Sequence, residues 1–179
     1  MFDRDYTFKG RHSNIVTKLT SEIDGETNFK IFERNIDVLI ISAIIGYLYG
    51  RMSNKDDSGL VTSDNVKKIN FDQINKESNT LNYNYELIML LHEKNTVSIE
   101  ERLNRAFRYE DGSDEKKQCF AIFEKYVLGG IDILNEKILV DANNVDDYIN
   151  NLYNFLNEYN ERYNSNITDN EIIDLCTNI

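Results

Sequence analysis

The sequence predicts an all-α fold, a single-domain bundle of about six to eight helices around one buried apolar helix spanning 36–50. The run from Ile36 to Tyr49 is the only long apolar stretch in a polar, Asn-rich chain, and it is apolar around its whole circumference. A helix without a polar face packs inside a bundle. The 179 residues contain no proline and only 8 glycines, which suits helices joined by Asn, Asp and Ser turns. With 41% hydrophobic and 28% charged residues, the composition is globular.

The first half of the chain divides into an N-terminal arm, residues 1–12, and the start of a helical domain that continues over residues 13–179. In the arm Tyr6 and Phe8 alternate with polar residues, which indicates an extended segment. Ser13 can cap a helix that runs to Asp24. A second helix is expected to begin near residue 27 or 28, to absorb the apolar run and to end within 51–54. A polar loop follows over 55–59, and residues 60–70 fit either a short strand or an irregular crossing.

Helical spacing of apolar residues predicts the remaining elements, and two capping boxes mark helix starts. Ser98 with Glu101 opens one helix, and Thr168 with Glu171 opens the last. Gly129-Gly130 interrupts an otherwise helical pattern, which indicates a close helix crossing with a possible kink; Gly46 and Gly50 also permit close approach. The predicted helices cover residues 71–78, 80–94, 98–109, 114–139, 144–163 and 169–176.

Several functional classes are disfavoured by composition. The apolar run is about 14 residues long, short of the roughly 20 that span a membrane. Cys119 and Cys176 lack C-x-x-C spacing, and we expect reduced, largely buried thiols in a cytoplasmic protein. The formal net charge is -11. The segment after Ile138 contains eight acidic residues and one basic residue, Arg162. Its negative charge disfavours non-specific binding to nucleic acid or anionic membranes.

One row of positive charge stands out. Arg102, Arg105 and Arg108 lie three residues apart along one side of a predicted helix, and guanidinium groups match phosphate and carboxylate geometry. They are the predicted contacts to a partner protein or to DNA. The alternative is a solvated face that pairs with acids of the same chain. Lys9 and Arg11 give the arm a basic character, which suits either partner contact or an ordinary solvated terminus.

No catalytic, cofactor or metal motif is present in the sequence. His12 and His92 are the only histidines, and neither has a carboxylate or cysteine at ligand spacing. A cleft that joins either histidine to a carboxylate would revive an enzymatic interpretation. Asp37, at the start of the apolar run, is expected to pair with Arg34 or Arg51 or to sit in the first helical turn.

A family resemblance is carried by five segments that follow one another in the chain. These segments are Phe8-Lys9-Gly10-Arg11-His12, Ile31-Phe32-Glu33-Arg34-Asn35-Ile36-Asp37, Ile44-Ile45-Gly46-Tyr47-Leu48-Tyr49-Gly50-Arg51, Ala106-Phe107-Arg108-Tyr109 and Tyr126-Val127-Leu128-Gly129-Gly130-Ile131-Asp132. In this order they resemble small accessory proteins found beside bacterial DNA phosphorothioation (Dnd-type) defence genes. The resemblance implies a cytoplasmic role in a defence or restriction complex, as a binding component and not as a known enzyme. No cofactor is expected.

The leading functional hypothesis is therefore a non-enzymatic accessory subunit of a bacterial DNA-defence or DNA-processing complex, with a protein partner and possible DNA contact. A second is an acidic regulator of the DNA-mimic type, which would occupy a basic protein site with the C-terminal surface. A third is an enzyme of unrecognised type. A homo-oligomer is compatible with all three.

Overall fold

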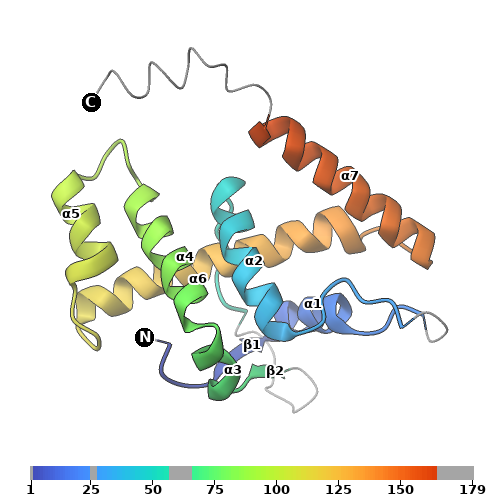
Figure 1. Cartoon of the computed structure of the whole chain (residues 1–179), viewed down its shortest axis with the longest axis horizontal. Helices are drawn as coiled ribbons and strands as arrows, with labels where there is room; N and C mark the ends of the chain where they lie inside the picture. The colour runs from blue at the N-terminus through green and yellow to red at the C-terminus, as the bar shows by residue number, and fades with distance from the viewer. Residues whose placement is uncertain (1, 25–27, 57–65, 165–179) are drawn as a thin grey trace. The chain divides into compact units, whose positions relative to one another are not determined.

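The computed structural model describes residues 2–24, 28–56 and 66–164 (Figure 1). These residues form seven α-helices, two short π-helical turns and one two-stranded sheet, which confirms the predicted all-α class. Contacts divide the chain into two compact units, Met1–Glu136 and Lys137–Ile179. The elements are β1 (Tyr6–Lys9), α1 (Gly10–Thr20), α2 (Asn35–Leu48), β2 (Val66–Ile69), α3 (Phe71–Lys76), α4 (Ser78–Leu91), α5 (Ile99–Leu103), η2 (Asn104–Arg108), α6 (Asp114–Leu134), η3 (Asn135–Leu139) and α7 (Val145–Asn164).

The crossing of α2 with α6 is the centre of the first unit (Figure 1). A Cβ atom on Gly46 would fall within 3.0 Å of the Tyr126 carbonyl oxygen. One on Gly130 would come equally close to the carbonyl oxygen of Ser42. The two backbones touch where side chains are missing, so the close crossing expected at Gly129-Gly130 is confirmed. The helix α6 continues through both glycines to Leu134.

The helix α2 begins at Asn35, later than the residue 27 or 28 that the sequence predicts. Asn28 adopts a left-handed backbone (φ 51°), and the neighbouring Phe29 forms a β-bridge with Asp24, so the chain turns there instead of coiling. The Asp37 carboxylate accepts hydrogen bonds from the Arg34 backbone N–H and from its guanidinium. The expected pairing of Asp37 is confirmed, with Arg34 as its partner.

The burial of α2 is one-sided, although its sequence is apolar on every side. Ile36, Val38 and Leu39 are fully buried, whereas Ile41 is 43% exposed. The expectation that the whole circumference lies in the core is therefore wrong at Ile41. Apolar residues can stand at a surface at modest cost, so sequence hydrophobicity does not determine which side faces solvent.

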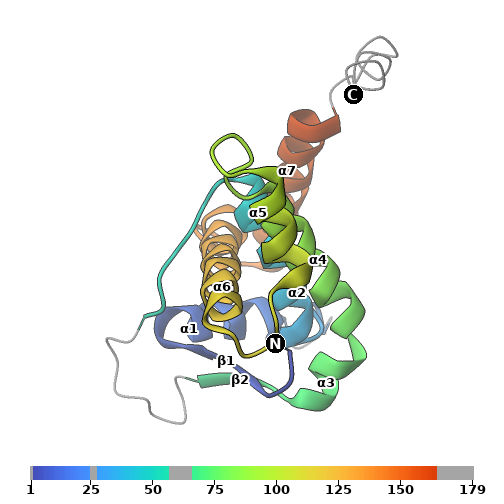
Figure 2. The same cartoon turned by 90° about the vertical axis from the view of Figure 1, so that its left-hand side faces the viewer.

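The N-terminal segment is partly extended and partly helical. Strand β1 pairs with β2 in antiparallel register, with Tyr6 opposite Ile69, so the strand alternative within 60–70 is observed. The helix α1 starts at Gly10 and not at Ser13. The Asp56 carboxylate accepts a hydrogen bond from the Arg11 backbone N–H at 3.0 Å and satisfies the helix N-terminus. Figure 2 shows α1 and the two strands lying on the same side of α6.

Capping residues set the beginnings of α5 and α6. The Ser98 hydroxyl accepts a hydrogen bond from the Glu101 backbone N–H, and Ser113 does the same for Lys116. The Ser98 half of the predicted capping box is confirmed. The Glu101 carboxylate instead accepts a hydrogen bond from the Tyr109 hydroxyl. Within the described residues, no helix is long and apolar enough to cross a membrane.

The second unit contains most of η3 and the helix α7. Lys137 Nζ pairs with Glu158 at 2.6 Å, and the Asn151 side-chain amide donates to the Ile138 carbonyl. The predicted amphipathic helix over 144–163 is confirmed as α7. The capping box at Thr168 and the thiol of Cys176 lie outside the described residues.

Candidate functional site

The three arginines of the predicted row lie on α5 and η2 and have acceptors within the protein. Arg102 Nη1 donates to the Leu90 carbonyl at 2.8 Å, and its Nε is buried without a partner among the described residues. The Arg105 guanidinium, only 18% exposed, pairs with Glu101 and Glu93. Arg108 pairs with Glu100 but remains 56% exposed. Arg108 is therefore the member of the row that is most accessible to a partner.

Lys9 and Arg11, the basic residues of the arm, also differ in their surroundings. Lys9 is exposed at the end of β1. The Arg11 guanidinium reaches from an exposed position to the buried Asp132 carboxylate, with Nη2 2.8 Å from Oδ2. Gly10 before it has a positive φ of 55°, and a Cβ there would collide with Asp56. The glycine lets the chain turn so that Arg11 can reach α6.

Asp132 forms a buried polar cluster with Arg11, His12 and Ser53. Besides Arg11, its Oδ2 accepts a 2.5 Å hydrogen bond from the Ser53 hydroxyl. His12 Nε2 lies 3.4 Å from its Oδ1, close enough for electrostatic attraction but not aligned as a hydrogen bond. Two segments that carry the family resemblance, at 8–12 and 126–132, thus meet at one carboxylate.

His12 is the most enclosed titratable side chain of this cluster, at 1% exposure. Burial lowers the pKa of His12, and the Arg11 charge adds to this effect against the opposing attraction of Asp132. The cavity beside it measures about 60 Å³ and is lined in part by Phe8, Lys55 and Asp56. Such a space can hold water but not an organic substrate.

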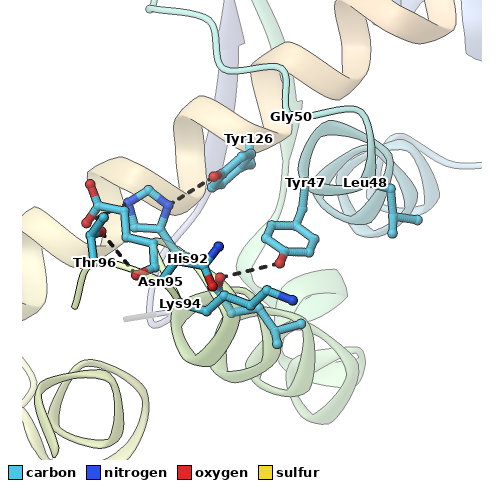
Figure 3. A pocket seen from close by; sticks show the side chains of 10 residues that line it. Tyr47, Leu48, Gly50, His92, Lys94, Asn95, Thr96 and Tyr126 are labelled. Atoms are coloured by element: carbon cyan, nitrogen blue, oxygen red, sulfur yellow. Dashed lines mark hydrogen bonds and ion pairs between the residues drawn. The ribbon is translucent and has the colours of Figure 1, made fainter. Parts of the chain in front are cut away.

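His92 lies at a shallow, open pocket of about 630 Å³ between the ends of α2 and α4 (Figure 3). Its Nδ1 is 2.9 Å from the Tyr126 hydroxyl, and its Nε2 is 3.5 Å from the Glu93 carboxylate. The Tyr47 hydroxyl donates to the Leu91 carbonyl across the same pocket. Burial lowers the pKa of His92, so the neutral imidazole is favoured here as well.

The two neutral histidines make stability dependent on pH. In the unfolded chain each imidazole takes up a proton near its ordinary pKa of 6.5, whereas the folded chain resists protonation until a lower pH. The unfolded state therefore binds more protons in this interval, and the free energy of unfolding should fall as the pH drops below about 6.5. Urea denaturation at pH 7.5, 6.5 and 5.5 measures this slope.

His92→Gln serves as the control, because it removes one titrating group at the edge of a pocket and should reduce the slope. A free energy of unfolding that rises towards pH 5.5 would contradict the prediction that both imidazoles resist protonation in the folded chain. It would mean that Asp132 or Glu93 holds its neighbouring imidazole protonated in the folded state.

A further site is a groove of about 550 Å³ where η2 meets the N-terminal segment and the start of α6. Phe107 and Arg108 line it and are 55% and 56% exposed. Lys116 and Tyr85 also line it, and Lys116 lies over the Tyr85 ring with Nζ 4.4 Å from the ring centroid. Four acids and two bases line the groove, namely Asp3, Glu86, Glu110 and Asp111 with Arg108 and Lys116.

These arrangements limit the available chemistry. Both histidines lie beside carboxylates, which is the juxtaposition an enzymatic role would require. However, the cavity that His12 lines is water-sized, and His92 Nδ1 lies 2.9 Å from the Tyr126 hydroxyl. Among the described residues, no group of three or more His, Cys, Asp or Glu side chains is arranged to hold a metal ion.

Asp132 and Ser53 were not among the site residues predicted from the sequence. A signal for Asp132 was present, because it is an acid within the apolar sequence Leu128-Gly-Gly-Ile-Asp-Ile-Leu, and a buried carboxylate requires a partner. No local pattern marks Ser53. Its position in the segment after α2, with its N–H donating to the Lys125 carbonyl, brings it to α6.

The family comparison supports the expected membership. Residues 10–175 match the family described as DNA sulphur modification system-associated protein 4. No curated protein and no solved structure matches the chain. The matched region contains the exposed Arg108, and also Arg11 with its buried ion-pair partner Asp132. Because the match extends over far more than half of its length, the chain belongs to this Dnd-associated family.

Proposed function

We propose that this protein is a non-enzymatic interaction subunit of a bacterial DNA sulphur modification system and that it binds another protein of that system. Its family supports association with the system. A cytoplasmic location belongs to the same proposal, because the DNA on which such a system acts lies in the bacterial cytoplasm. A role in antiviral defence is also part of the proposal.

The observation that carries the proposal is the exposure of Phe107 and Arg108 side by side in the groove at η2. Aromatic and arginine side chains are enriched among the residues that dominate protein interfaces. Phe107 supplies apolar area, and Arg108 supplies a guanidinium that can exchange Glu100 for an acceptor on the partner. Lys9 and Arg11 on the arm are proposed as additional contacts. Arg102 and Arg105 instead bind acceptors of the protein itself and stabilise the packing of α5 and η2.

The charge of the groove favours protein over DNA as the partner. Its four acids outnumber its two bases, and neighbouring carboxylates repel phosphates. Arg102 and Arg105, which would extend a phosphate-binding row, donate to acceptors in the protein. Arg102 and Arg105 are therefore better suited to hold α5 and η2 against the end of α4 than to follow a DNA backbone.

The test is the double variant Phe107→Ala/Arg108→Ala in co-purification with the other proteins of the modification system. We expect binding to weaken at least about tenfold, as for truncated interface anchors. Tyr83→Ala is the matched control, because Tyr83 is a 63% exposed aromatic residue on α4 that does not line the groove.

Equal binding of wild type and the double variant would reject this groove as the contact surface. A DNA mobility-shift assay with Arg108→Ala tests the alternative. Loss of a wild-type shift in that variant would favour direct DNA contact over the protein-only proposal.

A further inference from the structure

The helix α7 carries an exposed apolar stripe that the groove at η2 does not involve. Ile149, Tyr153 and Leu156 are 46%, 63% and 56% exposed. Their spacing of four and three residues places them on one face of the helix. Phe155, by contrast, is buried at 7% exposure, so the helix has apolar side chains on both an enclosed side and an exposed side.

The size and order of this stripe distinguish it from ordinary surface residues. Single exposed apolar side chains are common, but large ones that follow one another along one face of a helix form a patch. Anchors at positions i, i+4 and i+7 are the pattern by which an amphipathic helix enters a groove of another protein. Here the neighbours on the exposed face, Asn150 and Asn157, are uncharged and need little desolvation compared with ions.

Charge indicates what kind of surface fits the stripe. Between residues 137 and 164 five acids stand against two bases; these are Asp141, Asp146, Asp147, Glu158 and Glu161 with Lys137 and Arg162. Asp146 and Glu161 are exposed near the two ends of α7. A net negative helix is repelled by DNA and by a second copy of itself, and it is attracted by a surface rich in lysine and arginine.

We propose that α7 is a docking helix whose Ile149, Tyr153 and Leu156 insert into an apolar groove bordered by lysine or arginine on a protein of the DNA sulphur modification system. The inference rests on the proposed function for the identity of the assembly. It uses a different surface, so α7 and the groove at η2 make separable contributions to binding.

The first experiment places a photo-crosslinking amino acid at Tyr153 in the full-length chain. Each purified protein of the modification system is then added in turn, and the crosslinked peptides are mapped by mass spectrometry. The expected result is a crosslink to one such protein at a site flanked by Lys or Arg. Crosslinks only within the chain itself, or only between two copies of it, would overturn the proposal.

The second experiment compares Tyr153→Ala/Leu156→Ala with Asn150→Ala/Asn157→Ala, the matched pair on the same exposed face. Titration with the crosslinked protein should weaken about tenfold or more for the first pair and less than about twofold for the second. Asp146→Lys/Glu161→Lys should weaken binding and reduce its dependence on salt. Circular dichroism checks that each variant is folded.

The outcomes separate the two proposals. If the wild-type chain binds none of the system's proteins, both the proposed function and the docking helix are rejected. If wild type and Tyr153→Ala/Leu156→Ala bind equally, the docking helix alone is rejected. If only the variants of α7 lose binding while Phe107→Ala/Arg108→Ala retains it, the helix is the principal contact.

Discussion

A single methyl group at Gly130 is expected to prevent stable folding. In Gly130→Ala the new Cβ would lie within 3.0 Å of the Ser42 carbonyl oxygen and of the Gly46 backbone nitrogen. Both obstacles are backbone atoms of α2, so no side-chain rotation can relieve the contact. The helices would have to separate along the crossing that organises the first unit. We expect a loss of at least about 4 kcal/mol, a large part of the stability of a domain of this size.

Urea denaturation or, failing soluble expression, the fraction of soluble protein measures this effect. Gly50→Ala is the control, because Gly50 has a positive φ of 62° but no neighbouring atom lies within 4 Å of the place that its Cβ would take. It should lose only about 1–2 kcal/mol, the cost of a left-handed conformation with a side chain. A loss at Gly130 as small as that at Gly50 would show that the helices relieve the close contact at little cost, because Gly130 lies in α6 and alanine suits a helical backbone.

The glycine crossing is also where sequence reasoning was most successful. Two adjacent glycines in a helical pattern are costly unless something requires them, and a neighbouring backbone is such a requirement. The reasoning failed at the start of α2, where Phe29 and its neighbours have helical spacing. The left-handed Asn28 and the β-bridge between Asp24 and Phe29 depend on tertiary structure that periodicity does not encode.

The candidate site was harder to predict than the fold, for a related reason. The spacing of Arg102, Arg105 and Arg108 correctly suggested a shared helical segment but said nothing about acceptors on other elements. Glu93 and the Leu90 carbonyl lie at or just beyond the end of α4 and are brought to the arginines by packing. Asp132 meets Arg11 across 121 positions of sequence, a distance at which no local pattern applies.

The buried cluster around Asp132 gives the second large effect. In Asp132→Ala the Ser53 hydroxyl loses its acceptor and His12 loses its neighbouring charge, while the half-exposed Arg11 can turn to water. Buried polar groups without partners cost about 1–3 kcal/mol each, so we expect a loss of about 3 kcal/mol in urea denaturation. Asp132→Asn keeps the volume and one acceptor oxygen, and it should lose about half as much.

A double-mutant cycle with Arg11→Met measures how much of the stability lost at Asp132 comes from its ion pair with Arg11. Arg11→Met leaves the Asp132 carboxylate without its guanidinium but with the Ser53 hydroxyl, and because Arg11 is 55% exposed this should cost about 1–2 kcal/mol, less than in a fully buried pair. The double variant Arg11→Met/Asp132→Asn removes both charges and should lose at least about 1 kcal/mol less than the sum of the single losses. Additive losses would mean that the 2.8 Å contact contributes little and that Asp132 acts through Ser53 and His12 alone.

The same variants separate a structural role from a catalytic one. If Asp132 stabilises the contacts of α1 and the segment after α2 with α6, partner binding should follow stability, and both should recover in Asp132→Asn relative to Asp132→Ala. If His12 and Asp132 instead act as an acid–base pair, Asp132→Asn should abolish function while it remains nearly as stable as wild type. The burial of His12 and the water-sized cavity beside it favour the first result.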